Sequence, residues 1–165
     1  MKNWKSLLLG GVGLLWELPV PAAVTCDVMA TGVAFGVYNP LAGANLDATG
    51  NVNFSCTRTG LLDLTPGVSY SVQLNMGGSG MYSQRHLSAG VNTLNYNLYR
   101  DAARTLIWGD GTGGSSVQPG SVSFPLLSLS SVTRDNDHTI YGRLFGGQNV
   151  PAGSYSDTIT VTVMF

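Results

Sequence analysis

The chain has 165 residues, of which only 10% are charged, and its formal net charge is −1 at pH 7. Such sparse charge, with no basic cluster, argues against nucleic acid or an anionic membrane as a partner. The length suits one domain with a substantial hydrophobic core.

Residues 1–22 have the organisation of a secretory signal peptide. Two lysines precede an apolar run at residues 7–15, and small residues follow around Ala22. Because this run is too short to cross a bilayer, we expect no membrane span. We expect export through the periplasm to the cell surface, or secretion. We expect cleavage after Ala22 or Ala23, and the cut after Ala22 would leave one domain at residues 23–165. Cleavage after Gly13 is the alternative.

Cys26 and Cys56 both lie in the expected mature part, and an even count in an exported chain indicates a disulfide. The bridge would close a loop of about 30 residues, which stabilises by roughly 3 to 4 kcal/mol in the chain-entropy model. A metal pair is a poorer interpretation because no histidine or further cysteine lies nearby in the sequence. A reactive free thiol is the other alternative.

Short alternations of apolar and polar residues then recur along the chain, which is typical of half-buried β-strands. They cover residues 28–38 (with glycines at 32 and 36), 52–56, 68–74, 94–98, 140–144 and 158–165. Turn-forming stretches such as Gln118-Pro119-Gly120 separate them. About seven short strands with this spacing predict an all-β fold, a sandwich of two antiparallel sheets.

The most strand-like segment is the last one. Ile159, Val161, Val163 and Phe165 alternate with threonines, so the four apolar side chains share one face. The alternation continues to the last residue of the chain. We therefore expect an earlier segment, or another molecule, to pair this edge and cover its apolar face.

Candidate catalytic chemistry is sparse, and we predict no enzyme, no catalytic residue, no metal site and no cofactor. The only histidines are His86, in a predicted loop, and His138, at the predicted start of a strand. No serine sits in a Gly-x-Ser-x-Gly motif. Residues 135–137 (Asp-Asn-Asp) could hold Ca²⁺ through oxygen ligands, but a polar hairpin tip explains them as well.

Four aromatic residues have two interpretations. Tyr82, Tyr99, Trp108 and Phe124 could form a sugar- or surface-binding patch, although Trp108 more often anchors the core of a sandwich. Tyr155, just before the last strand, suits a corner tyrosine whose hydroxyl bonds the backbone.

Several segments together resemble the spore coat protein U domain family. They are residues 26–40, 46–50, 94–105, 108–114, 141–143 and 150–165. The block from 94 to 114, which reads LNYNLYRDAART followed by WGDGTGG, is similar to the central signature of that family. The resemblance covers nearly all of the expected mature chain.

The resemblance implies a subunit of archaic chaperone–usher pili, acting in surface attachment and biofilm formation. Such subunits are incomplete immunoglobulin-like sandwiches that lack their last strand. A periplasmic chaperone lends a strand, a neighbouring pilus subunit later replaces it, and an outer-membrane usher exports the fibre. By similarity, Ile159, Val161, Val163 and Phe165 would line the acceptor groove for that strand.

With cleavage after Ala22, few residues would precede Cys26. We therefore expect a subunit that accepts a strand without donating one, which fits the tip of a fibre. The alternative function is a stand-alone secreted β-sandwich, either a spore or cell-coat component or a small sugar-binding module.

Overall fold

The computed structural model describes residues 24–59, 65–126, 128 and 130–165. The signal peptide expected at residues 1–22 lies outside them. The described elements, in chain order, are β1 (Val24–Thr31), the 3-10 helix η1 (Pro40–Ala42), β2 (Leu46–Arg58), β3 (Gly67–Leu74), the 3-10 helix η2 (Gly77–Ser79), β4 (Arg85–Ala89), β5 (Asn92–Tyr99), β6 (Gln118–Ser123), β7 (Val132–Leu144) and β8 (Val161–Met164). Among these residues, no helix is long and apolar enough to span a membrane.

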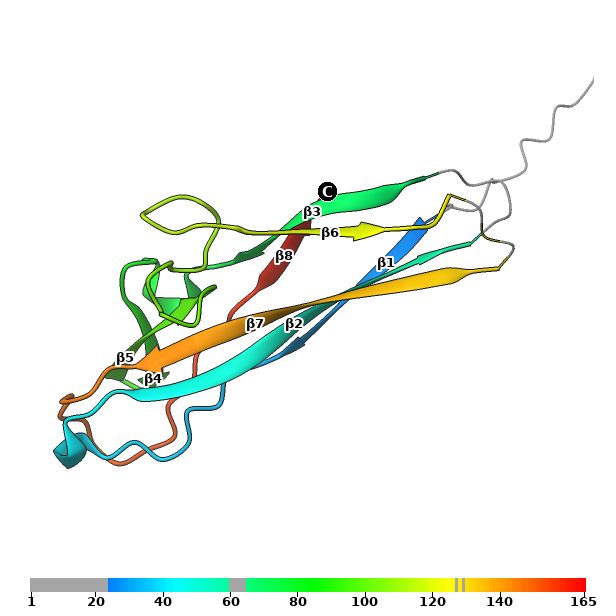
Figure 1. Ribbon diagram of the computed structural model, residues 1–165. Helices are drawn as coiled ribbons and strands as arrows, with labels where there is room; N and C mark the ends of the chain where they lie inside the picture. Colours follow the sequence, from blue (N-terminus) through cyan, green and yellow to red (C-terminus); the bar gives the residue numbers. More distant parts are fainter. Residues whose placement is uncertain (1–23, 60–64, 127, 129) are drawn as a thin grey trace, which may run out of the picture.

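The strands form two antiparallel sheets that pack face to face (Figure 1). The larger sheet has the order β1-β2-β7-β5-β4, and the smaller has the order β6-β3-β8. The hydrophobic core lies between them and takes residues from both. The predicted all-β architecture of two antiparallel sheets is confirmed.

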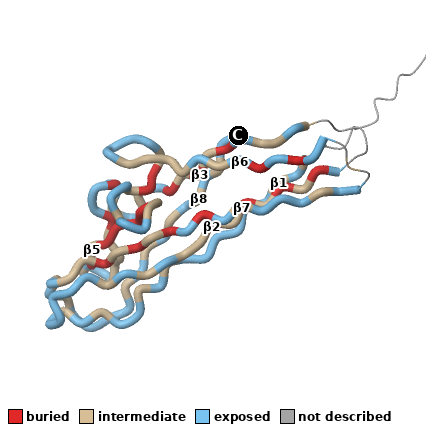
Figure 2. Tube along the Cα trace, viewed as in Figure 1, coloured by how far each residue is buried: buried red, intermediate tan, exposed pale blue. Residues whose placement is uncertain are grey.

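Sequence alternation places the core correctly in the long strands. In β2, Val52, Phe54 and Cys56 are all fully buried, and the residues between them are half-buried. In β3, Val72 and Leu74 are buried on the face that meets β2 and β7 across the core. Figure 2 shows buried residues interspersed along the facing strands of the two sheets. Burial on one face therefore explains why these segments form strands.

Trp108 anchors the core, as its residue type suggested. Its side chain is fully buried, and its indole Nε1 donates a hydrogen bond of 2.9 Å to the carbonyl oxygen of Val72. Tyr82, Tyr99 and Phe124 are buried as well. The alternative of a sugar-binding patch built on these four aromatic residues is therefore wrong.

The predicted strand over residues 28–38 is wrong in its extent. β1 ends at Thr31, which pairs with Asn51, and residues 32–39 have no regular structure. A Cβ on Gly50 would lie 2.5 Å from the carbonyl oxygen of Thr31, so the chain passes very close to β2 here. Alternation did not reveal this departure, because an irregular segment that packs on the core can show the same two-residue period.

Two strands, β4 and β6, escape the sequence prediction. His86 lies in β4 rather than in a loop, and the predicted turn at residues 118–120 opens β6. Pro119 fits there because β6 pairs with β3 alone among the described strands, so no second neighbour needs its missing N–H. The turn residues misled the prediction because they stand in an edge strand.

The polar stretch at residues 135–137 was predicted as a hairpin tip, and this is wrong. It lies inside β7, and His138 lies in the middle of that strand rather than at its start. The reason is a set of cross-strand contacts: the amides of Asn51 and Asn53 donate to Asp137 Oδ1 at 2.7 and 3.0 Å. Such polar pairs stabilise the solvent face of a sheet.

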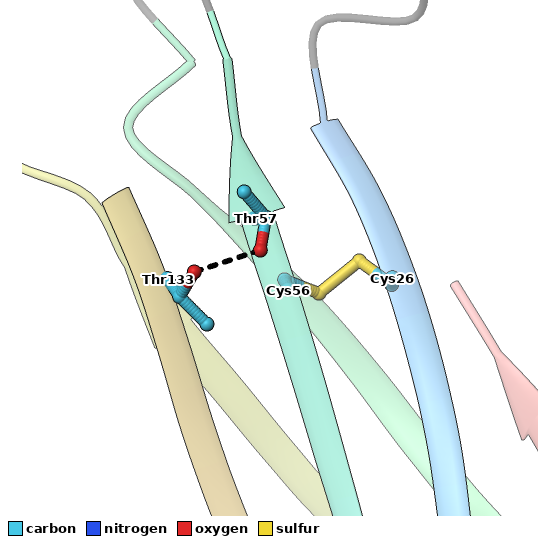
Figure 3. The surroundings of a disulfide bond; sticks show 4 residues. All are labelled: Cys26, Cys56, Thr57 and Thr133. Atoms are coloured by element: carbon cyan, nitrogen blue, oxygen red, sulfur yellow. Dashed lines mark hydrogen bonds between the residues drawn. A yellow bond between two sulfur atoms is a disulfide. The ribbon is translucent and has the colours of Figure 1, made fainter. Parts of the chain in front are cut away.

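Cys26 and Cys56 form a disulfide, as predicted (Figure 3). They are directly opposite each other in the pairing of β1 with β2. On the other side of β2, the hydroxyls of Thr57 and Thr133 are 2.8 Å apart, which connects β2 to β7. The bridge thus fixes the outermost strand of the larger sheet to its neighbour.

Candidate functional site

The outer edge of β8 has no strand partner among the described residues. β8 pairs with β3 on one side only, in the register Leu74–Val161 and Val72–Val163. One residue beyond, the amide of Asn75 donates to the carbonyl oxygen of Thr160 at 3.1 Å. Because alternate residues of a strand address opposite neighbours, the backbone N–H and C=O of Val161 and Val163 point away from β3. We call this side of β8 the open edge.

The four predicted groove residues lie on and beside β8. Ile159, Val161 and Val163 are half-buried and pack against the core. Phe165 is 75% exposed, although its ring centroid lies 5.8 Å from that of Phe54. The structure therefore brings three of the four onto the core, and their role in accepting a strand stays a prediction.

Residues 32–39, which we call the crossing segment, follow β1 along the chain. Val33 and Phe35 are half-buried against the core. A Cβ on Gly142 would lie 2.6 Å from Val33 Cγ1 and 2.9 Å from Phe35 Cζ, so this glycine makes room for both side chains on β7. None of the backbone–backbone hydrogen bonds described involves residues 32–38. The segment is thus held by its side chains.

A cavity of about 670 Å³ separates the crossing segment from residues 150–157, which lead into β8. Most of its lining residues are apolar, and Ser156 and Asp157 contribute polar groups. The lining includes Phe35, Leu87, Leu94, Leu144, Val150 and Tyr155. A volume of this size can hold several side chains, and cavities in a well-packed interior are far smaller. The interior at this end of the sandwich is therefore not filled by side chains between the crossing segment and residues 150–157.

The apolar face of β1 is also exposed to solvent in part. Val28 stands directly opposite Phe54 in the β1–β2 pairing, so the two side chains share a face. Phe54 is fully buried, yet Val28 is 42% exposed. The inward face of β1 is thus uncovered where that of β2 is covered. Together, the cavity, the open edge and Val28 describe an apolar site with one unpaired strand edge.

Two tyrosines brace the segment that bounds the cavity. Tyr155 donates its hydroxyl to the carbonyl oxygen of Pro151 at 2.9 Å, which confirms the predicted backbone bond. Tyr96 donates to Asp157 Oδ2 at 2.7 Å. Burial raises the pKa of Tyr96 far above its usual range, and the bond to Asp157 raises it further, so the phenol keeps its proton.

A fully buried arginine lies behind this segment. Arg85 is 0% exposed, and none of the ion pairs among the described residues includes it. Burial lowers the pKa of its guanidinium, but an arginine keeps its charge in proteins. Four hydrogen bonds to oxygen atoms compensate the desolvated charge.

The two histidines do not come together to form a catalytic or metal-binding site. His138 is buried and places Nε2 2.9 Å from the Tyr70 hydroxyl, whereas His86 lies on β4, in the same sheet but separated from β7 by β5. The described part of the chain contains no group of three or more His, Cys, Asp or Glu side chains that could hold a metal ion. The arrangement offers main-chain hydrogen bonding and apolar contact, which suit the binding of an extended chain.

Sequence reasoning missed the crossing segment as one side of the site. Its alternation at Val33 and Phe35 was visible, but it was assigned to a strand continuous with β1. The glycines that admit it, Gly50 and Gly142, carried a weak signal, because a glycine inside a strand often marks close backbone approach.

Comparisons with known proteins bear on this site. The model of the family described as the Spore Coat Protein U domain matches residues 18–162. Protein U of Myxococcus xanthus is 28% identical over 136 residues, which cover 79% of this chain and 70% of that protein.

Among solved structures, the chain is similar to the CsuC-CsuE chaperone-tip adhesion subunit pre-assembly complex from the archaic chaperone-usher Csu pili of Acinetobacter baumannii. The TM-score is 0.49 at 20% identity, over 86% of this chain. The chain spans only 40% of the length of the chain that it matches there.

Proposed function

The chain belongs to the Spore Coat Protein U domain family, and from that premise we propose that it is a structural or adhesive subunit of an archaic chaperone–usher pilus. The observation that carries the proposal is the open edge of β8, together with the cavity lined by the residues that lead into this strand. We assign the subunit no catalytic activity.

Strand addition from another protein is the reaction that this site supports. An extended segment placed between β8 and the crossing segment would bond the backbone groups of Val161 and Val163. Its alternate side chains would enter the cavity and cover Val28. Pairing the open edge and covering the apolar side chains would both stabilise the subunit, because an unpaired edge beside exposed apolar surface favours aggregation.

We propose three protein partners, which the family membership implies. A periplasmic pilus chaperone lends the first strand, a neighbouring pilus subunit replaces it, and an outer-membrane usher exports the fibre. Ile159, Val161, Val163 and Phe165 form the acceptor groove on the β8 side. The fibre serves surface attachment and biofilm formation.

Export requires a signal peptide at residues 1–22, leaving residues 23–165 as the mature domain. The position in the fibre is a separate proposal, a tip subunit that accepts a strand without donating one. Val24 and Thr25 support it in part, because they already pair with Arg58 and Thr57 within this domain. Mass spectrometry of the mature N-terminus tests both proposals. An alternating extension of about ten residues before Cys26, long enough for a strand, would contradict the tip position.

A stand-alone component of a spore or cell coat is the second candidate. The observation that favours it is the similarity to Protein U and the name of the family. In that role the domain would have to be stable without a strand from another protein.

Expression with and without a periplasmic pilus chaperone from the same genome separates the two candidates. We expect the chain alone to aggregate or to melt at low temperature, and the chaperone to hold it in a soluble one-to-one complex. A soluble monomer with a high, cooperative melting transition, unchanged by the chaperone, would overturn the pilus proposal.

A further inference from the structure

Arg85 places its whole guanidinium against main-chain and amide oxygens. Its Nε and one terminal nitrogen donate to the carbonyl oxygen of Asn75 at 3.1 and 2.8 Å. That terminal nitrogen also donates to the carbonyl oxygen of Trp108 at 2.8 Å, and the other to Asn97 Oδ1 at 2.8 Å. The carbonyl of Asn75 is therefore committed to a buried cation.

As a result, the carbonyl oxygen of Asn75 does not accept a backbone hydrogen bond from Thr160, where the β3–β8 pairing would continue. In a regular antiparallel pair, the two residues exchange both backbone hydrogen bonds. The amide of Asn75 does donate to the carbonyl oxygen of Thr160. The amide of Thr160, however, donates to Asn75 Oδ1 at 3.0 Å, because the carbonyl oxygen of Asn75 faces Arg85. The asparagine side chain takes the place of its own carbonyl.

The same stretch is fixed at two further points. Ser156 exchanges backbone hydrogen bonds with Ser88 of β4 at 2.8 and 3.1 Å. Asp157 accepts from the amide of Gly78 at 2.9 Å and from the hydroxyl of Tyr96. Residues 156–160 therefore connect the edge of one sheet to the edge of the other, and Ser156 and Asp157 also line the cavity.

We propose that Arg85 and Asn75 are positioning residues that hold residues 156–160 in the orientation in which the open edge of β8 accepts a strand. Arg85 turns the Asn75 carbonyl inward, and the Asn75 side chain then continues the ladder to Thr160. The link to strand acceptance rests on the function proposed above, whereas the positioning itself does not.

Hydrogen exchange of the full chain at low protein concentration tests the positioning. In Asn75→Ala, we expect the amide of Thr160 to exchange about fivefold to tenfold faster, as the loss of one hydrogen bond implies. Asn75→Asp keeps the acceptor oxygen and should restore slow exchange. The matched control is Gln73→Ala, on the same strand and facing Thr162, which should leave Thr160 unchanged. Arg85→Lys should also speed exchange, because lysine lacks the planar fork of donors.

A synthetic peptide that alternates valine with threonine and ends in lysines provides the second readout. Asn75→Ala should weaken peptide binding about fivefold to tenfold, and Gln73→Ala should leave peptide binding unchanged. Unchanged Thr160 exchange in Asn75→Ala, or no rescue by Asn75→Asp, overturns the positioning. Failure of the wild-type chain to bind the peptide and the chaperone instead overturns the proposed function, and the exchange result still decides the positioning.

Discussion

His138 makes the stability of the core sensitive to pH. Its side chain is 8% exposed and lies against Tyr70 and Trp108. Burial lowers the pKa of His138 below its ordinary value of 6.5, and nearby Asp137 opposes this only in part. The unfolded chain therefore takes up the proton first as the pH falls. The contribution of the neutral imidazole is complete above the ordinary pKa and is lost as the pH falls through the lowered one.

We predict that His138→Gln flattens the pH dependence of the free energy of unfolding between about pH 7 and 5. Wild-type protein should lose stability over this interval, and the variant should lose less. Urea unfolding at a series of pH values measures the difference. His86→Gln, on the edge strand β4, is the control. Equal slopes for the wild type and His138→Gln would contradict the prediction.

The sequence predicted which residues are buried only where the buried residue is apolar. Trp108 and Cys56 are apolar and buried, and the sequence indicates as much. Nothing in the sequence marks Arg85 as fully buried, because charged residues are almost always exposed unless paired. Its partners come from Asn75, Asn97 and Trp108, which only the folded chain brings together.

Among the strands, β1 depends most on a covalent bond. It is an edge strand with a single neighbour, and residues 28–31 at its far end are exposed. We predict that replacing both cysteines, Cys26→Ala with Cys56→Ala, lowers the free energy of unfolding by about 3 kcal/mol, as expected for a loop of this length. Urea unfolding of the double variant measures the loss. A change below about 1 kcal/mol would show that the β1–β2 ladder alone suffices.

Two glycines, Gly50 and Gly142, leave room for the crossing segment. They differ in the atoms that an added Cβ would contact. At Gly50 a Cβ meets the backbone of Thr31 and Gly32, which cannot turn away, whereas at Gly142 it meets the ends of side chains. We predict that Gly50→Ala costs about 2 kcal/mol of stability and Gly142→Ala less. Gly32→Ala is the control, because its Cβ would have open space. Thermal unfolding gives the order, and a larger loss for Gly142→Ala would contradict it.

The elements that sequence reasoning identified are those with one apolar face toward the core, namely β2, β3, β5 and β8. It misread elements stabilised by other means. β7 continues through polar residues because Asn51 and Asn53 bond Asp137 across the sheet. The crossing segment alternates like a strand, but its residues 32–38 make none of the described backbone–backbone hydrogen bonds. Periodicity reports burial, and it does not report pairing.

For the whole molecule, the sequence was sufficient for two antiparallel sheets and for the disulfide. It also located β8 as half of the candidate site. It could not supply the other half, since the cavity arises between residues 32–39 and 150–157, more than a hundred positions away along the chain. The proposed strand-accepting function rests on that long-range arrangement.

Hydrogen exchange at the amides of Val161 and Val163 tests the central claim most directly. These amides point to the open edge, so they should exchange rapidly in the chain alone. In the complex with a periplasmic pilus chaperone they should exchange at least about tenfold more slowly, because a donated strand bonds them. Exchange that is already slow in the chain alone, or that the bound chaperone leaves unchanged, would contradict strand acceptance at β8.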